Sequence, residues 1–203
     1  HFKILIHHKP KTMGTRLVTV STFTLLFSTT LLFHPSLSEL CNPNDKKVRL
    51  QIKKGFKDPY VLTSWKPDTD CCVDWYCVTC DPKTNRTNAL FVVKGGLSGQ
   101  IPPQIGDLPY LENLELHKNE NLTGPIPHAI TNLKHLKFLS LDWNSLSGSV
   151  PDFLSQLKNL TFLQLSFNNL TGPIPGSLSK LPYLWSLRLD RNKLTGTGPG
   201  IVW

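Results

Sequence analysis

Cysteine, methionine and long apolar runs are all scarce in this sequence of 203 residues. The last of the five cysteines is Cys80, so disulfides cannot cross-link the second half of the chain internally. After residue 38 no apolar run reaches the roughly 20 residues that span a membrane. No strongly basic helix is evident that would suit nucleic acid. These absences argue against a membrane-embedded or nucleic-acid-binding protein, and no residue pattern indicates a cofactor.

The first 38 residues have the pattern of a targeting segment. Met13 is the only methionine and the expected start, with residues 1–12 as upstream sequence. A basic MGTR, an apolar run of 17 residues and the small residues Ser36 and Ser38 follow. This order predicts a signal peptide cleaved after Ser38, and hence secretion. A transmembrane anchor is the alternative, but the run is short and rich in Ser and Thr.

Loss of that segment also changes the charge. The formal net charge falls from +8 to +4, because residues 1–38 hold four basic and no acidic side chains. A mildly basic surface would suit a weak association with an anionic matrix such as pectin. An ordinary solvated surface that binds no anionic matrix explains the same net charge.

One template repeats along the second half of the chain. LSGQIP, LTGPIP, LSGSVP, LTGPIP and LTGTGP are spaced so that successive glycines lie 25, 24, 24 and 24 residues apart. This period, together with the pattern LxLxxNxLxGxIP, is typical of leucine-rich repeats. We therefore predict a right-handed α/β solenoid with a parallel sheet on its concave face and 3-10 or short helical turns on its convex face.

The template also predicts the role of each position. Alternating leucines such as Leu139 and Leu141 should fill the core from short strands. The asparagine of each repeat should turn inward and satisfy backbone groups. One extra residue between Leu116 and Leu122 predicts a small bulge in a loop. The expected organisation is residues 1–38 as upstream sequence and signal peptide, 39–88 as an N-terminal cap, and 89–203 as about five repeats without a C-terminal cap.

The cysteines all fall in the predicted cap. Clustered cysteines in an exported chain indicate disulfides that staple a small unit. The alternative is a zinc site that uses the CxxC of Cys77 and Cys80, but no second well-spaced pair accompanies it. Within the cap, NDKKVRLQIKKGF predicts a helix that begins at Asn44 or Asp45. Its expected apolar face contains Val48, Ile52 and Phe56.

Residues that flank the inward leucines should point out of the concave sheet and form exposed columns. Aromatic side chains among them commonly mark an interface, although some could instead fold over a coil edge. Charges of both signs would steer and select a protein partner. The predicted partner-binding residues are Glu115, His117, Lys118, Phe138, Ser140, Asp142, Trp143, Phe162, Gln164, Ser166, Phe167, Arg188, Asp190 and Arg191.

One column contains His117, Asp142 and Ser166, which resembles the composition of a hydrolase triad. The order argues against it, because the histidine must stand between the serine and the carboxylate. An exposed sheet also offers no evident oxyanion hole. We therefore expect that this protein is not an enzyme.

Four N-x-S/T sequons are expected in an exported glycoprotein. Asn169 is the best candidate, because it follows the inward Asn168 and should face water. The four asparagines are Asn85, Asn121, Asn159 and Asn169.

Several long strings resemble plant polygalacturonase-inhibiting proteins over about residues 39–196. They are CNPNDKKVRLQIKKGFKDPYVLTSW, DCCVDWYCVTC and VPDFLSQLKNLTFLQLSFNNLTGPIP. The resemblance implies a protein of the plant extracellular space or cell wall. It implies that the concave face docks on endopolygalacturonases of fungi and some insects and limits pectin degradation, without catalysis. It also implies disulfides Cys41–Cys71 and Cys72–Cys80, which leaves Cys77 unpaired or intermolecular.

The chain departs from that pattern in three ways. The family has roughly twice as many repeats and a cysteine-bearing C-terminal cap. The last motif is GTGP, and the GIVW that follows resembles nothing in the family, which indicates a truncated or frame-shifted sequence. Arg49 stands where the family usually has leucine.

Other functions compete with the inhibitor hypothesis. The same coils could form the ligand-binding ectodomain of a receptor-like protein. Ice binding would favour flat columns of threonine or asparagine, whereas these columns are heterogeneous. A repeat scaffold without activity is a further alternative.

Overall fold

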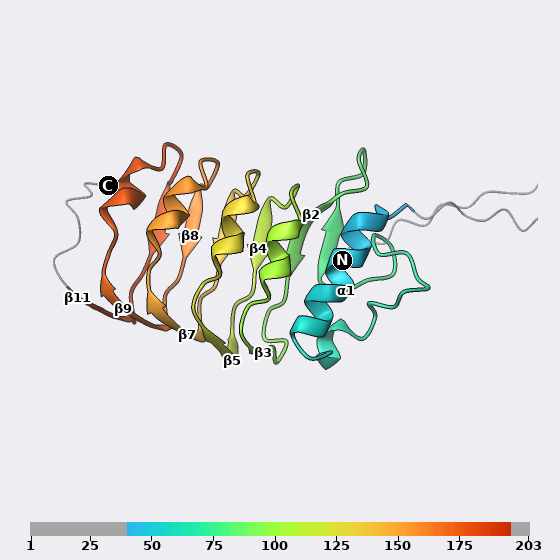
Figure 1. The fold of residues 1–203 in the computed structure, drawn as a ribbon, viewed down its shortest axis with the longest axis horizontal. Helices are drawn as coiled ribbons and strands as arrows, with labels where there is room; N and C mark the ends of the chain where they lie inside the picture. The colour runs from blue at the N-terminus through green and yellow to red at the C-terminus, as the bar shows by residue number, and fades with distance from the viewer. Residues whose placement is uncertain (1–39, 196–203) are drawn as a thin grey trace, which may run out of the picture. The chain divides into compact units, whose positions relative to one another are not determined.

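The computed structural model describes residues 40–195, which Figure 1 shows as a helical cap followed by stacked coils. The predicted signal peptide and the last glycine of the repeat pattern lie outside the described residues. No helix in the range 40–195 has both the length and the hydropathy to cross a membrane.

Each coil contributes one strand to each of two sheets and one 3-10 turn between them. The six-stranded sheet has the order β1-β2-β4-β6-β8-β10 within the described residues. Its strands are β1 (Val78–Cys80), β2 (Thr87–Phe91), β4 (Asn113–Glu115), β6 (Phe138–Ser140), β8 (Phe162–Gln164) and β10 (Ser186–Arg188). Only β1 pairs antiparallel there, with β2.

The second sheet is five-stranded in the same part of the chain and was not predicted from the sequence. Its strands are β3 (Ser98–Gly99), β5 (Asn119–Gly124), β7 (Asn144–Ser149), β9 (Asn169–Pro173) and β11 (Lys193–Thr195). They carry the NxLxG part of the template.

The register follows the template. Leu114, Leu139 and Leu163 pair across β4, β6 and β8, and each repeat position lies beside its equivalent in the next coil. The register between β5 and β7 shifts between Asn119 and Thr123. The extra residue therefore produces the predicted bulge, but within β5 and not in a loop as expected.

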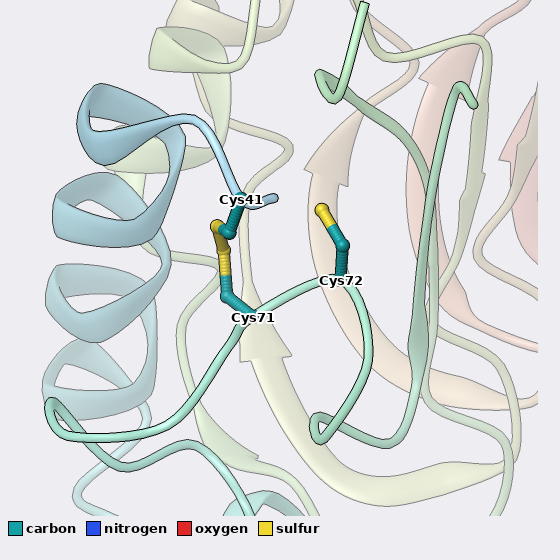
Figure 2. A group of neighbouring side chains, drawn as sticks. All are labelled: Cys41, Cys71 and Cys72. Atoms are coloured by element: carbon teal, nitrogen blue, oxygen red, sulfur yellow. A yellow bond between two sulfur atoms is a disulfide. The ribbon is translucent and has the colours of Figure 1, made fainter. Parts of the chain in front are cut away.

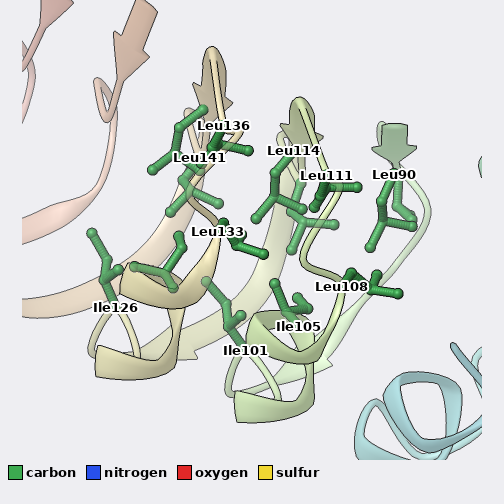
Figure 3. Packing of buried hydrophobic residues seen from close by; sticks show 14 of the residues in the cluster. Leu90, Ile101, Ile105, Leu108, Leu111, Leu114, Ile126, Leu133, Leu136 and Leu141 are labelled. Atoms are coloured by element: carbon green, nitrogen blue, oxygen red, sulfur yellow. The ribbon is translucent and has the colours of Figure 1, made fainter. Parts of the chain in front are cut away.

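Leucines and isoleucines from strands and turns fill a continuous core (Figure 3). Leu114 from a strand and Ile105 from a turn meet in this core, as Figure 3 shows. Leu139, Leu163 and Ile130 are fully buried at the equivalent positions of later coils. Each such side chain stabilises the fold by about 1.5–3 kcal/mol relative to exposure. The turns are η2 (Pro103–Asp107), η3 (His128–Asn132), η4 (Asp152–Gln156) and η5 (Gly176–Lys180).

The G-x-I/V-P motif shapes the return path of each coil. Gly124, Gly148 and Gly172 have φ of 78°, 86° and 76°, a left-handed conformation that favours glycine. A proline in extended conformation then immediately precedes each 3-10 turn, as Pro151 does before η4. Glycine and proline thus bend the chain at the same points in successive coils.

The inward asparagines link each coil to the one before it. Asn168 Nδ2 donates to the carbonyl oxygens of Leu141, at 2.8 Å, and Leu165, at 3.1 Å. Its Oδ1 accepts the backbone N–H of Leu146 at 3.0 Å. Asn144 and Asn119 make the equivalent bonds one and two coils earlier. The predicted backbone role of these asparagines is confirmed.

The cap begins with α1 (Pro43–Gly55) and the 3-10 turn η1 (Tyr60–Leu62). The predicted N-cap was wrong: Asn42 caps the helix, its side chain accepting the N–H groups of Asn44 and Asp45. Pro43 fits the first helical position because it has no N–H to satisfy.

The predicted inner face of α1 was only partly correct. Ile52 and Phe56 are buried as expected, but Val48 is only partly buried. Arg49 is fully buried beside Asp45 instead. A charged residue was not expected there, because periodicity counts only apolar positions.

Candidate functional site

The outward residues of β4, β6, β8 and β10, with the residues that follow each strand, form a surface that we call the sheet face. Lys118, Trp143, Arg188, Asp190 and Arg191 are exposed on it. Half-buried members are Glu115, His117, Phe138, Phe162, Gln164 and Phe167. The structure therefore brings the predicted columns together on one surface.

Three predicted members of that surface are buried, so the expectation that they would be exposed was wrong. Ser140, Asp142 and Ser166 are only 3%, 6% and 0% exposed. Their short side chains do not rise above longer neighbours in the adjacent coils. A partner would reach them only through the gaps between those neighbours.

An aromatic row runs along the side of the sheet face where the strands begin. Phe138 and Phe162 have ring centroids 5.4 Å apart, and Phe162 meets Trp185 edge-on at 5.3 Å. Trp185 is 76% exposed and was not predicted as a site residue. The sequence did carry one signal for Trp185. The equivalent positions of the two earlier coils are Lys137 and Thr161, neither of which is aromatic.

A second aromatic group lies where the strands end. Trp143 and Phe167 stack with centroids 3.6 Å apart and planes 9° from parallel. The guanidinium carbon of Arg191 lies 5.9 Å from the Phe167 ring centre. Side by side in successive coils, these residues form a ladder of flat groups.

The ladder depends on an unusual backbone conformation. Lys94, Lys118, Trp143, Phe167 and Arg191 all have φ between 53° and 60°. Bulky residues rarely adopt this left-handed region because Cβ approaches the carbonyl oxygen. In the four later coils the conformation turns the chain from the sheet face into the inward asparagine that follows, whereas Gly95 follows Lys94. Its recurrence at one template position shows that the turn, not the side chain, imposes it.

A groove of about 480 Å³ adjoins this ladder. Trp143 and Phe167 contribute its aromatic wall, and Lys94, Lys118 and Glu120 bring charges of both signs. The remaining lining residues are Asn144 and Ser145. The groove extends the sheet face toward the second sheet.

Asp142 is the buried charge of this surface. Burial raises the pKa of its carboxyl above the ordinary value, although a backbone hydrogen bond from Ser166 and the charges of Arg188 and His117 oppose the shift. Its Oδ1 finds no hydrogen-bond partner within the described residues.

The column of His117, Asp142 and Ser166 does not form a nucleophilic triad. The Ser166 hydroxyl donates to Asp190 Oδ1, and His117 Nε2 lies 3.7 Å from Glu115 Oε2. The hydrogen bond from Ser166 lowers the pKa of Asp190 below its usual value. Because its proton is directed to a carboxylate and not to an imidazole, Ser166 lacks the base that would activate it.

The cysteines of the cap form two disulfides, Cys41–Cys71 and Cys72–Cys80. The sulfurs of Cys41, Cys71 and Cys72 lie within 4.8 Å of one another, and Figure 2 shows the bond that joins the first two. Cys80 is therefore not available to the alternative zinc pair. Among the described cysteines Cys77 is free, and burial raises the pKa of its thiol.

Three of the four sequon asparagines, Asn121, Asn159 and Asn169, are exposed, and Asn85 is half-buried. Asn159 Nδ2 also donates to the carbonyl oxygen of Lys134 at 2.7 Å. Glycosylation of each sequon stays a prediction.

Comparison with known families and sequences agrees with the coil geometry. Residues 42–81 match the family described as leucine rich repeat N-terminal domain, and residues 147–194 and 135–157 match leucine rich repeat families. A polygalacturonase inhibitor of Pyrus communis is 68% identical over 131 residues, which cover 64% of this chain and 39% of the relative. A polygalacturonase inhibitor of Vitis vinifera is 62% identical over 109 residues, covering 54% and 32%. The chain thus spans less than two fifths of the length of these two relatives.

Solved structures show the same architecture. A plant ice-binding protein superposes with a TM-score of 0.74 and 52% identity, covering 76% of this chain and 50% of that one. The BIR3–SERK2 complex of Arabidopsis thaliana gives a TM-score of 0.70 and 35% identity, covering 77% of this chain and 86% of that one. These similarities agree with the stacked coils.

Proposed function

Because the chain belongs to the leucine-rich-repeat proteins, and among them to the group with relatives named polygalacturonase inhibitors, we propose that it is an extracellular inhibitor of fungal and insect endopolygalacturonases. The identity of 68% over 131 residues carries this proposal. In this role the protein acts in the plant cell wall, limits pectin degradation in defence and performs no catalysis.

The sheet face is the proposed contact surface. It combines two aromatic groups, which can bury large areas in an interface, with charges of both signs that select a partner. Asp142, which is 6% exposed, adds a negative charge just beneath this surface. An enzyme that binds a polyanionic substrate has cationic groups in its cleft, and the negative charge of Asp142 attracts such groups without direct contact. Blocking the cleft would inhibit the enzyme sterically.

A weak association with pectin is a second, finer part of the proposal. It rests on the net charge of +4 that remains after residues 1–38. Such an association would place the inhibitor where its target enzyme acts.

The test is a reducing-sugar assay of a fungal endopolygalacturonase on polygalacturonate, with the purified chain as inhibitor. We expect Trp143→Ala to raise the inhibition constant at least about tenfold, because it removes one half of the exposed aromatic stack. Asp142→Ala should also weaken inhibition. Tyr60→Ala is the matched control, since Tyr60 is 89% exposed but lies in the cap.

Unchanged inhibition by both the Trp143 and the Asp142 variant would refute the sheet face as the contact surface. A folded chain that is inert against several polygalacturonases would refute the inhibitor proposal for these coils.

A receptor-type ectodomain is the second candidate function. It is favoured by the coverage of 86% of the chain matched in the BIR3–SERK2 complex. In this case the sheet face would bind a ligand or co-receptor in place of an enzyme. Binding to a plant co-receptor ectodomain by calorimetry, without inhibition of any polygalacturonase, would support it.

A further inference from the structure

Arg49 places a buried positive charge against the disulfides of the cap. Its side chain is fully buried, and Nη1 donates to the carbonyl oxygen of Cys71 at 2.9 Å. Nη2 lies 2.6 Å from Cys71 Sγ, 3.2 Å from Cys41 Sγ and 3.8 Å from Cys80 Sγ. Disulfide sulfurs are weak hydrogen-bond acceptors. These three sulfur contacts therefore satisfy the N–H donors of the guanidinium poorly.

The nearest carboxylate is already engaged elsewhere. Asp45 accepts hydrogen bonds from Arg86, with Nη2 to Oδ1 at 2.7 Å, and from the Thr87 backbone N–H at 2.7 Å. Arg49 reaches only the backbone oxygen of Asp45, at 3.4 Å. A buried cation without its own anion is costly. Negative charge on a neighbouring sulfur would therefore be stabilised.

Arg49 remains a cation at neutral pH. Burial lowers its pKa to about 10, while the charges of Asp45 and Asp70 act in the opposite direction. Asp70 in turn accepts the backbone N–H groups of Cys41 and Cys72, so it holds both segments of the cluster in place.

Cys72 connects the outside of the cap with this buried cluster. Both Cys72 and Cys80 are half-buried, whereas Cys41 and Cys71 are 2% and 0% exposed. Cys72 Sγ lies within 4.8 Å of the sulfurs of Cys41 and Cys71. Figure 2 shows it beside their bond. A thiolate released at Cys72 would thus begin next to the buried disulfide.

We propose that the cap is a thiol–disulfide exchange site for small thiols such as glutathione. The external thiolate has access to both half-buried sulfurs, and the branch that leads on is attack on Cys80 Sγ, which forms a mixed disulfide there and releases the Cys72 thiolate. That thiolate then attacks Cys41 Sγ, which forms Cys41–Cys72 and releases Cys71 as a thiolate beside Arg49. One disulfide is consumed and one formed in each step, and no further oxidant or reductant is needed.

The geometry selects the sulfur that is attacked in the second step. Attack on Cys71 would join neighbouring residues, whose Cα atoms lie about 3.8 Å apart, closer than the roughly 4.4–6.8 Å of ordinary disulfides. Attack on Cys41 avoids this and makes Cys71 the leaving group. A leaving thiolate of lower pKa departs faster, and a nearby arginine lowers that pKa.

The experiment maps the cysteines after exposure to glutathione. The oxidised full chain is incubated with reduced glutathione, quenched, alkylated with N-ethylmaleimide and analysed by peptide mass spectrometry. We expect glutathione on Cys80, alkylation on Cys71 and a new Cys41–Cys72 disulfide. Alkylation of Cys71 should also persist to lower pH than is usual for a thiol, since Arg49 stabilises the thiolate.

Arg49→Leu is the decisive variant, because the resembled family usually carries leucine at this position. It should keep the far-ultraviolet circular dichroism of the folded chain but reduce Cys71 alkylation about tenfold at the same glutathione concentration. Arg49→Lys keeps the charge and should retain part of the reaction. Equal Cys71 alkylation in all three proteins would overturn the proposal, as would glutathione on Cys80 without any Cys41–Cys72 disulfide.

Discussion

Asp142 shows how a single residue of the site can cost stability. Burial raises the pKa of its carboxyl in the folded protein. The folded state therefore binds this proton more tightly than the unfolded chain. The unfavourable contribution is present above the folded pKa and disappears as the pH falls below the ordinary carboxyl pKa.

We expect Asp142→Asn to raise the thermal midpoint at pH 7, because it removes a buried charge without changing the shape of the side chain. The gain should disappear near pH 3, where the native carboxyl is neutral. Circular dichroism melts at both pH values test this, with exposed Asp107→Asn as the control. An equal gain at both pH values would mean that charge is not the cause.

Other properties of individual residues could not be predicted from the sequence. Trp143 and Phe167 were expected on the sheet face, but their left-handed backbone was not, because nothing in their side chains favours it. The burial of Ser140 and Ser166 depends on the length of neighbours in adjacent coils, which the template alone does not reveal.

At the scale of the elements, the inward asparagines hydrogen-bond each coil to the one before it, and we call these connections the asparagine joints. Each one replaces the hydrogen bonds that a regular ladder would provide where the chain leaves the six-stranded sheet. Asn168 is 8% exposed and bonds two consecutive coils. Its neighbour Asn169 is exposed.

We expect Asn168→Ala to lower the free energy of unfolding by about 2–4 kcal/mol, because it leaves several buried backbone groups without partners. Asn169→Ala is the matched control and should change it by less than about 0.5 kcal/mol. Urea titration followed by circular dichroism measures both. If both variants lost a similar free energy of unfolding, the inward hydrogen bonds of Asn168 would not be the source of the stability.

Repeat spacing was sufficient to predict the parallel strands β4, β6, β8 and β10 of the six-stranded sheet, but not the antiparallel β1 of the cap. It did not predict the second sheet, because NxLxG alternates too briefly to stand out as a strand. It also misplaced the start of α1, since Asn42, Asn44 and Asp45 are all good N-cap residues and only Pro43 decides among them.

At the scale of the whole described region, one core runs through every coil. Leu139 lies between Leu114 and Leu163, its equivalents in the adjacent coils. In such arrays each repeat is stabilised mainly by its nearest neighbours. Damage in one coil should therefore weaken the coils beside it first.

We expect Leu139→Ala to destabilise the protein by about 2–5 kcal/mol through the cavity it creates. Hydrogen exchange should rise in β4, β6 and β8 before it rises in α1. Lys137→Ala is the control in the same coil, because its ion pair with Glu112 is exposed and weak. A uniform rise across all elements would show that the coils unfold as one unit.

The stacked coils, their core leucines and the first parallel sheet could be predicted from the sequence, because the period fixes the same positions in every coil. The candidate site could be predicted only as a set of columns. Trp185 was missed because it lies one residue before its strand, and the groove beside Trp143 was missed because it depends on how two coils turn. The buried Arg49 was noticed only as a departure from leucine.

The asparagine joints also determine how the stack would respond to mechanical force. Each joint fastens a coil to the one before it, so tension on the end with β11 loads one set of bonds at a time. The coils would then unfold one after another, beginning at that end. Each event would release one repeat of about 24 residues, or roughly 80 Å of extended chain. Under force such a protein would lengthen in equal steps of one repeat, while the coils that have not yet unfolded keep their structure.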